Sequence, residues 1–534
     1  MNASRRRFLR GSAAALLAPP LLGRGAGPIA AWARSRLSVR DHGAKGDGKT
    51  NDTRALQAAI DAAGRTGGTV FFPPGEYVSG TLHLRSRVTL ALGAGAILIA
   101  SRDDADFDPV EQLPYKSYAD EETRDFRFAL LQGRGLAQVG VVGPGRIDGN
   151  RSSRRGPKPI ALRQCRDVRI SGLTILNAGS YNVSLLGCDR VDIAGVTIRN
   201  GRSDGIDPDC CRNVRIRDCR IETEDDAIVL KASFALGTRS GTRNVTVTGC
   251  HLTTLHNGLK LGTESTGDFR DVVFRDCTIV GRPHVWKGEL SSGLAIETVD
   301  GGHLERVSVS DVRMTNVRSP IFVRLGRRGR GQDVPAAGTL KTISISNVTA
   351  VGATIASSIT GIPDHAVSGV SIKNVRITAR GGGGADLVAQ SVPELEKTYP
   401  DAYMFRDLPA YGLYARHVDG LVLDGLDLGF DQADARPALV LEDVRHARVI
   451  GLRAMPASEG DEPLVWLRSV RDFVLDGLRP RERTRRVVRL SGEDTARIRI
   501  ERSDVSGIER VATIDKGVAA DALTMQASAL SRAR

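Results

Sequence analysis

Aromatic residues, long apolar runs and helical patterns are all scarce in this chain of 534 residues. Phe, Trp and Tyr make up 4% of it, which leaves few rings to stack on nucleic-acid bases, and the sequence carries no motif of a nucleic-acid-binding module. After residue 33 no apolar run reaches the length of about 18 residues that a membrane-spanning helix needs. We therefore expect neither nucleic acid nor a membrane among the partners.

Cysteine is present, but not in patterns that bind metals. None of the seven cysteines forms a CxxC pair, the spacing that zinc sites use. Cys165, Cys188 and Cys211 each precede a valine of a predicted strand by three residues. This regular position predicts that the thiols act as small apolar side chains in the interior. The sequence predicts no metal site and no cofactor.

A short repeat runs through most of the chain. The segments that begin at Cys165, Cys188 and Cys211 read CRDVRI, CDRVDI and CRNVRI, and their first residues are 23 positions apart each time. Similar units of alternating apolar residues, each followed by a small or polar turn, continue to Arg497. Repeats of this length that are built from short strands indicate a solenoid. We predict an all-β fold, a right-handed parallel β-helix.

The opening of the chain departs from the repeat and predicts a cap. Apolar residues recur at helical spacing from Thr53 to Ala63, and Asp52 or Thr53 can serve as N-cap. A helix here would cover the open end of the solenoid. The predicted divisions are an N-terminal cap with the first coils (34–101), a β-helix that carries the site (102–510) and a C-terminal tail (511–534).

The first 33 residues predict export. Residues 4–9 read SRRRFL, an apolar run follows from Ala13 to Leu22, and residues 31–33 offer a small-x-small cleavage site. This order is that of a twin-arginine signal. We expect residues 1–33 to be removed and the mature protein to be periplasmic or secreted.

Two acidic clusters mark the candidate site. Their members are Asp204, Asp207 and Asp209 in the first, and Glu222, Glu224, Asp225 and Asp226 in the second. Relative to the strand valines, Asp204, the Asp225–Asp226 pair and His256 occupy nearly the same place on three successive coils, which lie about 4.8 Å apart. Like charges on neighbouring strands are destabilising. A functional site therefore explains this stack better than the alternative, a solvated acidic face.

The motifs resemble those of glycoside hydrolase family 28, the polygalacturonase-like pectin hydrolases. Residues 40–63 and FFPPGEYVSG resemble the N-terminal cap of that family and of related pectin-active β-helices. SDGID (203–207) resembles the family's NTDGxD motif, EDD (224–226) its Gly/Gln-Asp-Asp, and HNGLKLGTE (256–264) the HGGxxIGSE stretch of exo-acting bacterial members. The resemblance covers residues 37 to about 430 and implies a hydrolase on the same β-helix.

The resemblance also implies roles for individual residues. Asp225 would be the general acid, and Asp204 and Asp226 would activate the water. The acid and base of an inverting glycosidase lie about 6.5–9.5 Å apart, and carboxylates one coil apart can be separated by this distance. Repulsion between the carboxylates would raise the pKa of the acid and keep it protonated. The predicted substrate-binding residues are His256, Lys260, Glu264, Glu297, Arg202 and Asp207. His256 could instead support the acid, or be a polar residue stacked at a turn.

Two departures from the family pattern concern the substrate. Arg202 and Ser203 replace Asn and Thr, which alters sugar contacts. Residues 293–298 read GLAIET where pectin-degrading members carry Arg-Ile-Lys, so that Ala295 and Glu297 stand where two cations would bind a galacturonate carboxylate. Glu297 should repel an acidic sugar. We expect a substrate other than plain polygalacturonate: a rhamnose-containing or neutral glycoside, or an oligosaccharide trimmed from one end.

The sequence leaves alternatives open. A net charge of +13 suits an acidic polymer as substrate and equally a basic solvated surface. A calcium-dependent pectate-lyase-like enzyme could use Asp207, Asp209 and Glu222 as oxygen ligands. A non-catalytic carbohydrate-binding β-helix is a third possibility, because a fold does not fix a function. The expected partner is a polysaccharide or oligosaccharide, and we expect a monomer.

Overall fold

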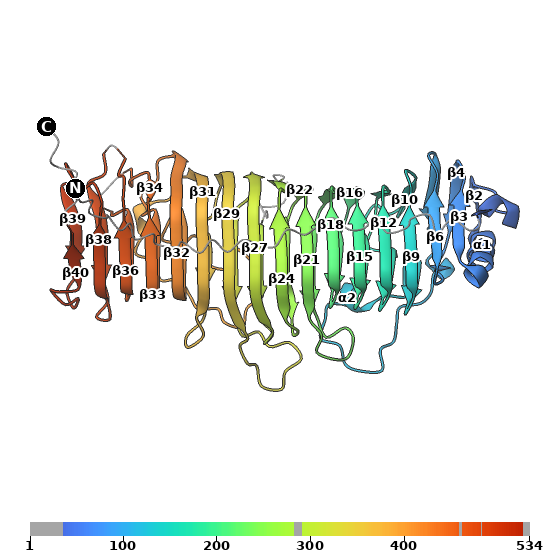
Figure 1. Cartoon of the computed structure of the whole chain (residues 1–534), viewed down its shortest axis with the longest axis horizontal. Helices are drawn as coiled ribbons and strands as arrows, with labels where there is room; N and C mark the ends of the chain where they lie inside the picture. Colours follow the sequence, from blue (N-terminus) through green and yellow to red (C-terminus); the bar gives the residue numbers. More distant parts are fainter. Residues whose placement is uncertain (1–35, 282–290, 459–461, 482, 527–534) are drawn as a thin grey trace, which may run out of the picture.

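The strands of this chain stack into one elongated solenoid. The computed structural model describes residues 36–281, 291–458, 462–481 and 483–526. Strands run across the long axis and follow one another along it in sequence order (Figure 1). All pairings between these strands are parallel, which confirms the predicted right-handed parallel β-helix. The export signal predicted for residues 1–33 lies outside the described residues.

Each coil contributes strands to three parallel ladders. Longer strands of the later coils bend through two ladders, and β32 bends through all three. The first ladder contains β5 (Leu82–His83), β8 (Ala129–Arg134), β11 (Lys158–Arg163), β14 (Val183–Leu186), β17 (Ile206–Asp209), β20 (Ile228–Ala232), β23 (Leu259–Ser265), β26 (Ser292–Thr298), β28 (Ser319–Leu325), β30 (Ser357–Thr360), β32 (Leu413–Gln432), β33 (Leu439–Ile450), β35 (Val465–Arg468), β37 (Arg486–Ser491) and β39 (Arg510–Ile514). The second contains β1 (Arg36–Ser38), β3 (Gly68–Phe72), β6 (Val88–Leu92), β9 (Ala137–Val142), β12 (Arg166–Ser171), β15 (Asp189–Ala194), β18 (Arg212–Arg217), β21 (Thr242–Thr248), β24 (Phe269–Arg275), β27 (His303–Thr315), β29 (Thr339–Ala353), β31 (Val367–Gly381), β36 (Arg471–Asp476), β38 (Ala496–Glu501) and β40 (Leu523–Met525). The third contains β2 (Asp47–Asn51), β4 (Gly75–Ser79), β7 (Ala96–Ala100), β10 (Arg146–Asp148), β13 (Thr174–Leu176), β16 (Thr197–Gly201), β19 (Arg220–Thr223), β22 (His251–Thr254), β25 (Thr278–Gly281) and β34 (Arg453–Ala454).

Identical small apolar side chains stack in the interior. Val168, Val191, Val214 and Val245 are paired in register on successive coils and are buried. Each such side chain contributes about 1.5–3 kcal/mol by leaving water. The seven cysteines are buried free thiols, which confirms the interior position predicted for Cys165, Cys188 and Cys211.

Rows of hydrogen-bonded polar side chains fix the turns at the start of the strands of the second ladder. Asn213 and Asn244 have positive φ angles of 55° and 54°, a conformation that Asn tolerates better than most residues. The side-chain amide of Asn244 donates to Asn213 Oδ1 at 2.6 Å, and that of Asn213 donates to Asp189 Oδ1 at 2.7 Å. The same turn is therefore repeated from coil to coil.

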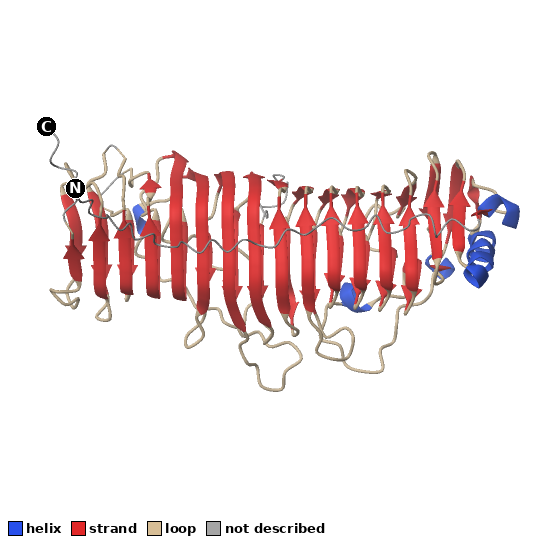
Figure 2. Ribbon diagram, viewed as in Figure 1, coloured by secondary structure: helices blue, strands red, loops and turns tan. Residues whose placement is uncertain are grey.

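Helices are few and lie at the margins of the solenoid (Figure 2). Helix α1 (Thr53–Thr66) covers the first coil with Leu56 and Ile60 buried, which confirms the predicted cap. Asp52 occupies the N-cap position, but its carboxylate accepts hydrogen bonds from the backbone N–H groups of Lys45 and Gly46 instead of capping the helix. None of the helices in the described part of the chain has the length and apolar character needed to cross a membrane.

The coils extend beyond the predicted boundary at residue 510. Strand β39 pairs with β37, and β40 pairs with β38. Residues 510–525 thus continue two ladders, where the sequence predicts the start of a tail. Their apolar pattern is too short and too exposed to reveal this continuation.

Two excursions lie on the outer face of the first ladder. The N-terminal cover (residues 102–128) contains η3 (Asp104–Asp106) and α2 (Glu121–Arg124), and its Phe126 packs with Ala161 and Leu186 of the ladder. The C-terminal cover (residues 382–411) contains η4 (Ala385–Leu387), and its Phe405 joins an apolar cluster with Phe322 and Trp466. The N-terminal cover also reaches along the ladder, where the hydroxyl of Tyr115 donates to the carbonyl oxygen of Ala235 at 2.7 Å and Asp120 forms an ion pair with Arg330 at 2.9 Å.

Candidate active site

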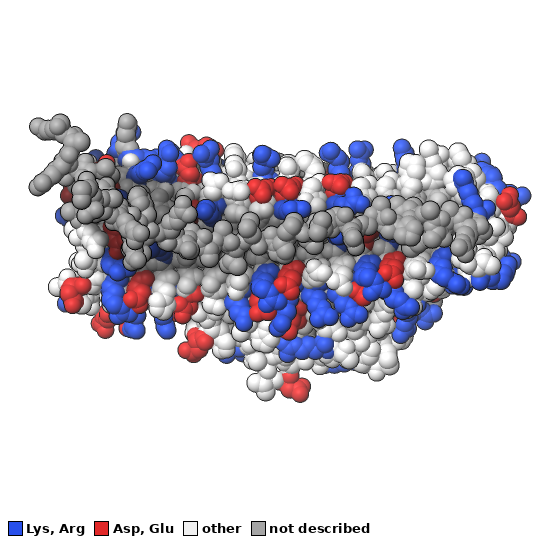
Figure 3. All heavy atoms as spheres, in the orientation of Figure 1, with Lys and Arg blue, Asp and Glu red and all other residues white. Residues whose placement is uncertain are grey.

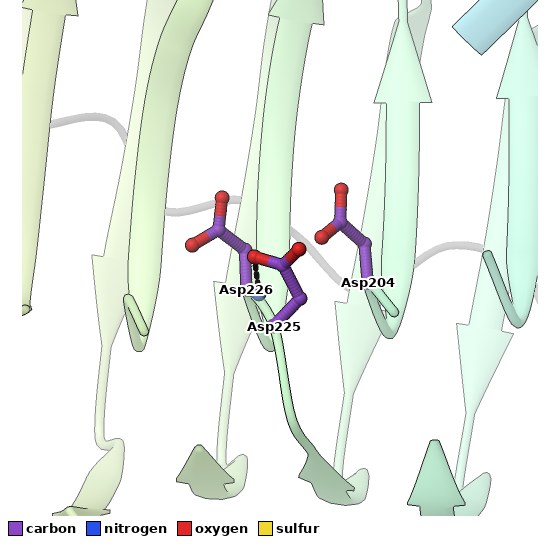
Figure 4. A group of neighbouring side chains, drawn as sticks. All are labelled: Asp204, Asp225 and Asp226. Atoms are coloured by element: carbon purple, nitrogen blue, oxygen red, sulfur yellow. Dashed lines mark hydrogen bonds between the residues drawn. The ribbon is translucent and has the colours of Figure 1, made fainter. Parts of the chain in front are cut away.

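Three aspartates meet on the outer face of the first ladder between the covers. Asp204 lies in the turn before β17, and Asp225 and Asp226 lie in the turn before β20, one coil further on (Figure 4). The backbone N–H of Gly205 donates to the carbonyl oxygen of Asp226 at 2.9 Å, which holds the two turns side by side. One oxygen of each carboxylate lies within 4.8 Å of one oxygen of both others. The predicted catalytic trio is thus brought together.

Asp204 is a buried carboxylate bound to a buried ammonium group. Its Oδ2 lies 3.0 Å from Nζ of Lys231, which also lies 3.0 Å from Oδ1 of Asp207 and donates to the hydroxyl of Tyr181 at 2.8 Å. Burial raises the pKa of Asp204 well above its ordinary value. Lys231 opposes this rise, and the neighbouring carboxylates of Asp207 and Asp225 add to it. Asp204 therefore favours its protonated form more than an ordinary aspartate does.

Asp226 is equally buried but is held ionised. Lys260 Nζ lies 2.9 Å from its Oδ2, and both the side-chain amide and the backbone N–H of Asn257 donate to its Oδ1, at 2.7 and 3.1 Å. Burial acts to raise its pKa, but Lys260, His256 and the hydrogen bonds outweigh burial and lower it. Two neighbouring carboxyl groups whose pKa values are driven apart can divide acid and base work.

Asp225 is the most accessible of the three carboxylates. Its side chain is 17% exposed, against 5% for Asp204 and 7% for Asp226. Its Oδ2 lies 2.5 Å from Nη1 of Arg154, a residue of the loop between β10 and β11. Its Oδ1 accepts the backbone N–H of Asp226 at 3.0 Å. A group at the surface of the trio is placed to reach a bound glycosidic oxygen.

Four predicted substrate-binding residues lie in the same region. His256 is half-buried in the turn before β23 and contributes to the low pKa of Asp226. Lys260 and Asp207 bind partners within the site, as described above. Burial raises the pKa of Glu264, with Lys231 opposing and Asp120 adding to the rise, and Glu264 Oε1 lies 3.8 Å from Nη1 of Arg330. Their role toward a sugar remains a prediction.

Glu297 is a buried carboxyl group at the edge of the site. It lies on β26 and is 1% exposed, and its Oε2 has no hydrogen-bond partner among the described residues. Burial raises its pKa to about 8, with Lys260 opposing the rise and Asp401 adding to it. A sugar carboxylate bound beside this group would meet either a negative charge or a desolvated acid, with no cation supplied from this position.

Arg202 turns toward the rim instead of toward the trio. Its guanidinium forms an ion pair with the carboxylate of Glu224, which is itself 42% exposed. The structure therefore places Arg202 at the edge, where contact with a longer ligand remains a prediction.

The residues considered as calcium ligands are not gathered into one site. Asp207 binds Lys231, and Asp209 accepts a hydrogen bond from the backbone N–H of Ser233 at 2.9 Å. Glu222 lies on β19 in the third ladder. The trio itself offers oxygens close enough to hold a cation, but the three basic side chains that bind these oxygens would have to be displaced.

Several partners of the trio are not predicted by the sequence. Lys231 interrupts the apolar run AIVLKAS, and an isolated lysine in such a run is the signal that could have found it. Asn257 lies within the motif HNGLKLGTE but carries no charge that would single it out. Arg154 has no sequence signal, because the loop between β10 and β11, which lies outside the repeat, brings it to Asp225. Tyr399 of the C-terminal cover lies over Lys260, with Nζ 5.8 Å from the ring centre, which makes this segment a wall of the site.

Comparisons with known proteins show which families this chain is similar to. The sequence model of Glycosyl hydrolases family 28 matches residues 117–394, and that of Rhamnogalacturonase A/epimerase, pectate lyase-like, matches residues 36–117. The chain is 28% identical over 370 residues to a "Probable polygalacturonase" of Vitis vinifera, which covers 64% of this chain and 74% of the relative.

Solved structures share the fold. An exopolygalacturonase from Thermotoga maritima has a TM-score of 0.57 at 21% identity, covering 65% of this chain and 87% of its own. The family 28 exopolygalacturonase of Yersinia enterocolitica has a TM-score of 0.60 at 19% identity, covering 78% of each chain. With the family match spanning more than half of its residues, the chain belongs to glycosyl hydrolases family 28 and is a glycoside hydrolase.

Proposed function

We propose that this protein is an exported hydrolase that cleaves glycosidic bonds of a pectin-type or related polysaccharide or oligosaccharide by an inverting, carboxylate-based mechanism. The observation that carries the proposal is the trio of Asp204, Asp225 and Asp226, whose oxygens lie within 4.8 Å of one another while each carboxylate binds a different cation. This arrangement gives three chemically equal groups three different surroundings.

The different surroundings of the three aspartates assign their catalytic roles. Asp225, the most accessible carboxyl, donates a proton to the leaving oxygen as general acid. Asp226, whose pKa is lowered, takes a proton from the attacking water, and Asp204, whose pKa is raised, holds that water by a hydrogen bond. A water held between two carboxyl groups is activated without a covalent bond between the sugar and the protein.

The spacing of the trio makes stereochemistry the test of this mechanism. One oxygen of each carboxylate lies within 4.8 Å of one oxygen of the others, whereas the span of about 6.5–9.5 Å in inverting enzymes refers to whole carboxyl groups. Support for inversion comes from the paired site for a water at Asp204 and Asp226. Proton NMR of the first anomer released should find inversion; a retained anomer would overturn the mechanism in favour of a covalent intermediate.

The substrate is a glycoside other than plain polygalacturonate. Ala295 is buried beneath the C-terminal cover, and Glu297 on the same strand adds a carboxyl group beside Lys260. Recognition of a carboxylate needs a cation, and these two positions supply none. We expect a neutral sugar, such as a deoxyhexose, on this side of the cleaved bond.

The covers favour a short substrate or a chain end. They bury the ladder residues Leu186 on one side and Ala295 on the other. Asp120 of the N-terminal cover also forms an ion pair with Arg330, in the loop after β28, so this cover reaches along the strands that carry the trio. A long polymer lying along the ladder would have to displace both covers, whereas an oligosaccharide fits between them.

The decisive experiment separates hydrolysis from the two other possibilities. Purified protein is incubated with galacturonan, rhamnogalacturonan and neutral oligosaccharides, with and without EDTA, and new reducing ends are recorded together with the absorbance of unsaturated products. Reducing ends without unsaturation, insensitive to EDTA and lost in Asp225→Asn, are expected. Unsaturated, EDTA-sensitive products would mean a calcium-dependent lyase, and binding without turnover a carbohydrate-binding protein.

Export is part of the proposal and has its own test. The sequence SRRRFL at residues 4–9 supports a twin-arginine route to the periplasm or the medium. Replacing Arg5 and Arg6 by Lys should leave the protein in the cytoplasm of a producing cell. Unchanged export of this double variant would contradict the twin-arginine assignment.

A further inference from the structure

The loop between β10 and β11 places a guanidinium over the general acid. Arg154 lies in this loop, outside the coils, with Nη1 2.5 Å from Oδ2 of Asp225 and Nη2 2.8 Å from Oε2 of Glu122 in the N-terminal cover. It occupies the carboxylate oxygen that a general acid must offer to the leaving group. Arg154 therefore has to move before Asp225 can act, and the proposed hydrolysis gives it no other role.

Of the three cations that bind the trio, Arg154 is the one a ligand can reach. The side chain of Arg154 is 49% exposed, whereas those of Lys231 and Lys260 are each 5% exposed. Lys231 contacts two aspartates and a tyrosine hydroxyl, which occupies its three donors. A guanidinium carries five donors in a planar fork that matches a carboxylate.

Arg154 and Glu297 lie on opposite sides of the reacting groups. The loop of Arg154 leads into β11, three strands before β20 in the first ladder, and Glu297 lies on β26, two strands after β20. A sugar that extends toward β26 meets a carboxyl group, and a sugar that extends toward β11 meets a cation. The two sides are therefore suited to sugars of different charge.

We propose that Arg154 is a specificity-determining residue that binds the carboxylate of an acidic sugar on the β11 side of the cleaved bond, and that it exchanges Asp225 for this carboxylate when substrate binds. The proposal rests on the hydrolysis proposed above and deepens it. One ion pair replaces another, and the released carboxylate of Asp225 takes up a proton from solvent, which it can then give to the leaving oxygen as general acid. The substrate class is a glycoside in which a uronic acid is joined to a neutral sugar.

Binding to a catalytically inactive enzyme tests the proposal. In Asp225→Asn the carboxylate of Asp225 is gone, so the Nη1 donor of Arg154 is released for a ligand while Nε and Nη2 remain bound to Glu122. The probes are an oligosaccharide of alternating rhamnose and galacturonic acid and the same oligosaccharide with its carboxyl groups reduced to alcohols, both measured by calorimetry. The further change Arg154→Ala should weaken binding of the acidic probe by about tenfold or more, as expected for a charge-assisted contact, and leave the reduced probe unaffected.

Arg155→Ala in the same Asp225→Asn background is the matched control. Arg155 is an exposed arginine of the same loop, and its loss should change neither affinity. Equal weakening of the binding of both probes by Arg154→Ala, or no weakening of either, would overturn the proposal. Thermal unfolding of the loop variants shows whether they remain folded. A failure of the proposed hydrolysis can be told apart from a failure of this proposal. If the hydrolysis is wrong, the wild-type protein cuts neither probe, whereas calorimetry still measures how much Arg154 contributes to binding the acidic probe.

Discussion

At the residue scale, the chemistry depends on how differently three adjacent aspartates are held. Asp204 and Asp226 are buried against Lys231 and Lys260, which are themselves residues of the coils, whereas Asp225 faces a cation from the loop between β10 and β11. The first two pairs are fixed when the solenoid forms, since each aspartate lies in the turn that leads into a strand and its lysine lies on the next strand of the ladder. The pair at Asp225 can open without disturbing a coil.

Lys260→Met should move the pH dependence of catalysis. Lys260 helps to hold the pKa of Asp226 low against burial, so that removing its charge lets burial raise this pKa. Asp226 must be ionised to take a proton, and the acid limb of the kcat/KM profile should therefore move to higher pH by about one to three units. Lys341→Met, at a lysine that is half exposed on β29, should leave the profile in place. An unshifted acid limb in Lys260→Met would contradict the role of Asp226 as base.

Glu297→Gln should remove a pH dependence of stability. The pKa of Glu297 is raised by burial to about 8 in the folded state, whereas in an unfolded chain it is about 4.3. The protonated form of Glu297 therefore stabilises the folded protein at low pH, and this stabilisation is lost as the pH rises from about 4.3 toward 8. At 1.4 kcal/mol per pKa unit, the loss in the free energy of unfolding is up to about 5 kcal/mol.

Denaturant unfolding of wild type and Glu297→Gln at pH 5 and pH 8 measures this difference. The variant should gain stability relative to wild type at pH 8, while Glu493→Gln, an exposed control, should not. A constant difference between the two proteins at both values of pH would mean that Glu297 stays ionised.

The sequence predicts the trio and Lys260, but not Lys231, Asn257 or Arg154. Asp204 and the Asp225–Asp226 pair occupy equivalent turns of a 23-residue repeat, and such a repeat converts sequence spacing directly into spatial proximity. Lys231 pairs across a coil with Asp204, a contact that the residue spacing alone does not distinguish from many others. Arg154 reaches Asp225 from a loop with no repeat, where position in space does not follow from position in the sequence.

At the element scale, the C-terminal cover is held by buried arginines of the first ladder. Arg324 on β28 is 1% exposed and donates to the carbonyl oxygens of Glu394 and Leu395, at 2.6 and 3.2 Å. Arg416 on β32 donates to those of Val392 and Pro393 in the same way. The cover is thus fixed through its backbone, so that its side chains are free to line the site.

Arg324→Met should loosen this cover without unfolding the coils. Removing the guanidinium leaves buried carbonyl oxygens unsatisfied, at a cost of about 1–3 kcal/mol, and a methionine cannot replace these donors. Limited proteolysis with mass mapping should find faster cleavage within residues 382–411. Arg327→Met removes a more exposed ion pair with Glu396, and such pairs contribute little. Equal cleavage rates in the two variants would contradict the anchoring role of Arg324.

The elements show where sequence patterns suffice and where they do not. The spacing of apolar residues from Thr53 to Ala63 predicts α1, and the helix begins at Thr53 and ends at Thr66, shortly after the predicted end. The residue type at the N-cap does not decide which N–H groups its side chain binds, and the carboxylate of Asp52 accepts hydrogen bonds from Lys45 and Gly46 of the preceding loop. The excursions carry no period, and their place over the ladder follows from tertiary packing alone.

At the scale of the whole molecule, one repeated coil sets the shape, and insertions into it set the function. The solenoid runs from α1 at one end to β39 and β40 at the other (Figure 1), and its core is continuous along that length. Basic and acidic side chains are interspersed over the face seen in Figure 3. The net charge of +13 is therefore not gathered into a single basic surface on this face, and selection of a charged substrate depends on individual residues such as Arg154.

Hydrolysis at the trio is tested most directly by the isotope composition of the products. The protein is incubated with the alternating rhamnose and galacturonic acid oligosaccharide in water enriched in oxygen-18, and early products are analysed by mass spectrometry. We predict that one heavy oxygen enters at each new reducing end, that no product lacks the elements of water, and that Asp225→Asn releases no product. Products that carry no heavy oxygen and are lighter by one water would contradict the account, because they arise by elimination.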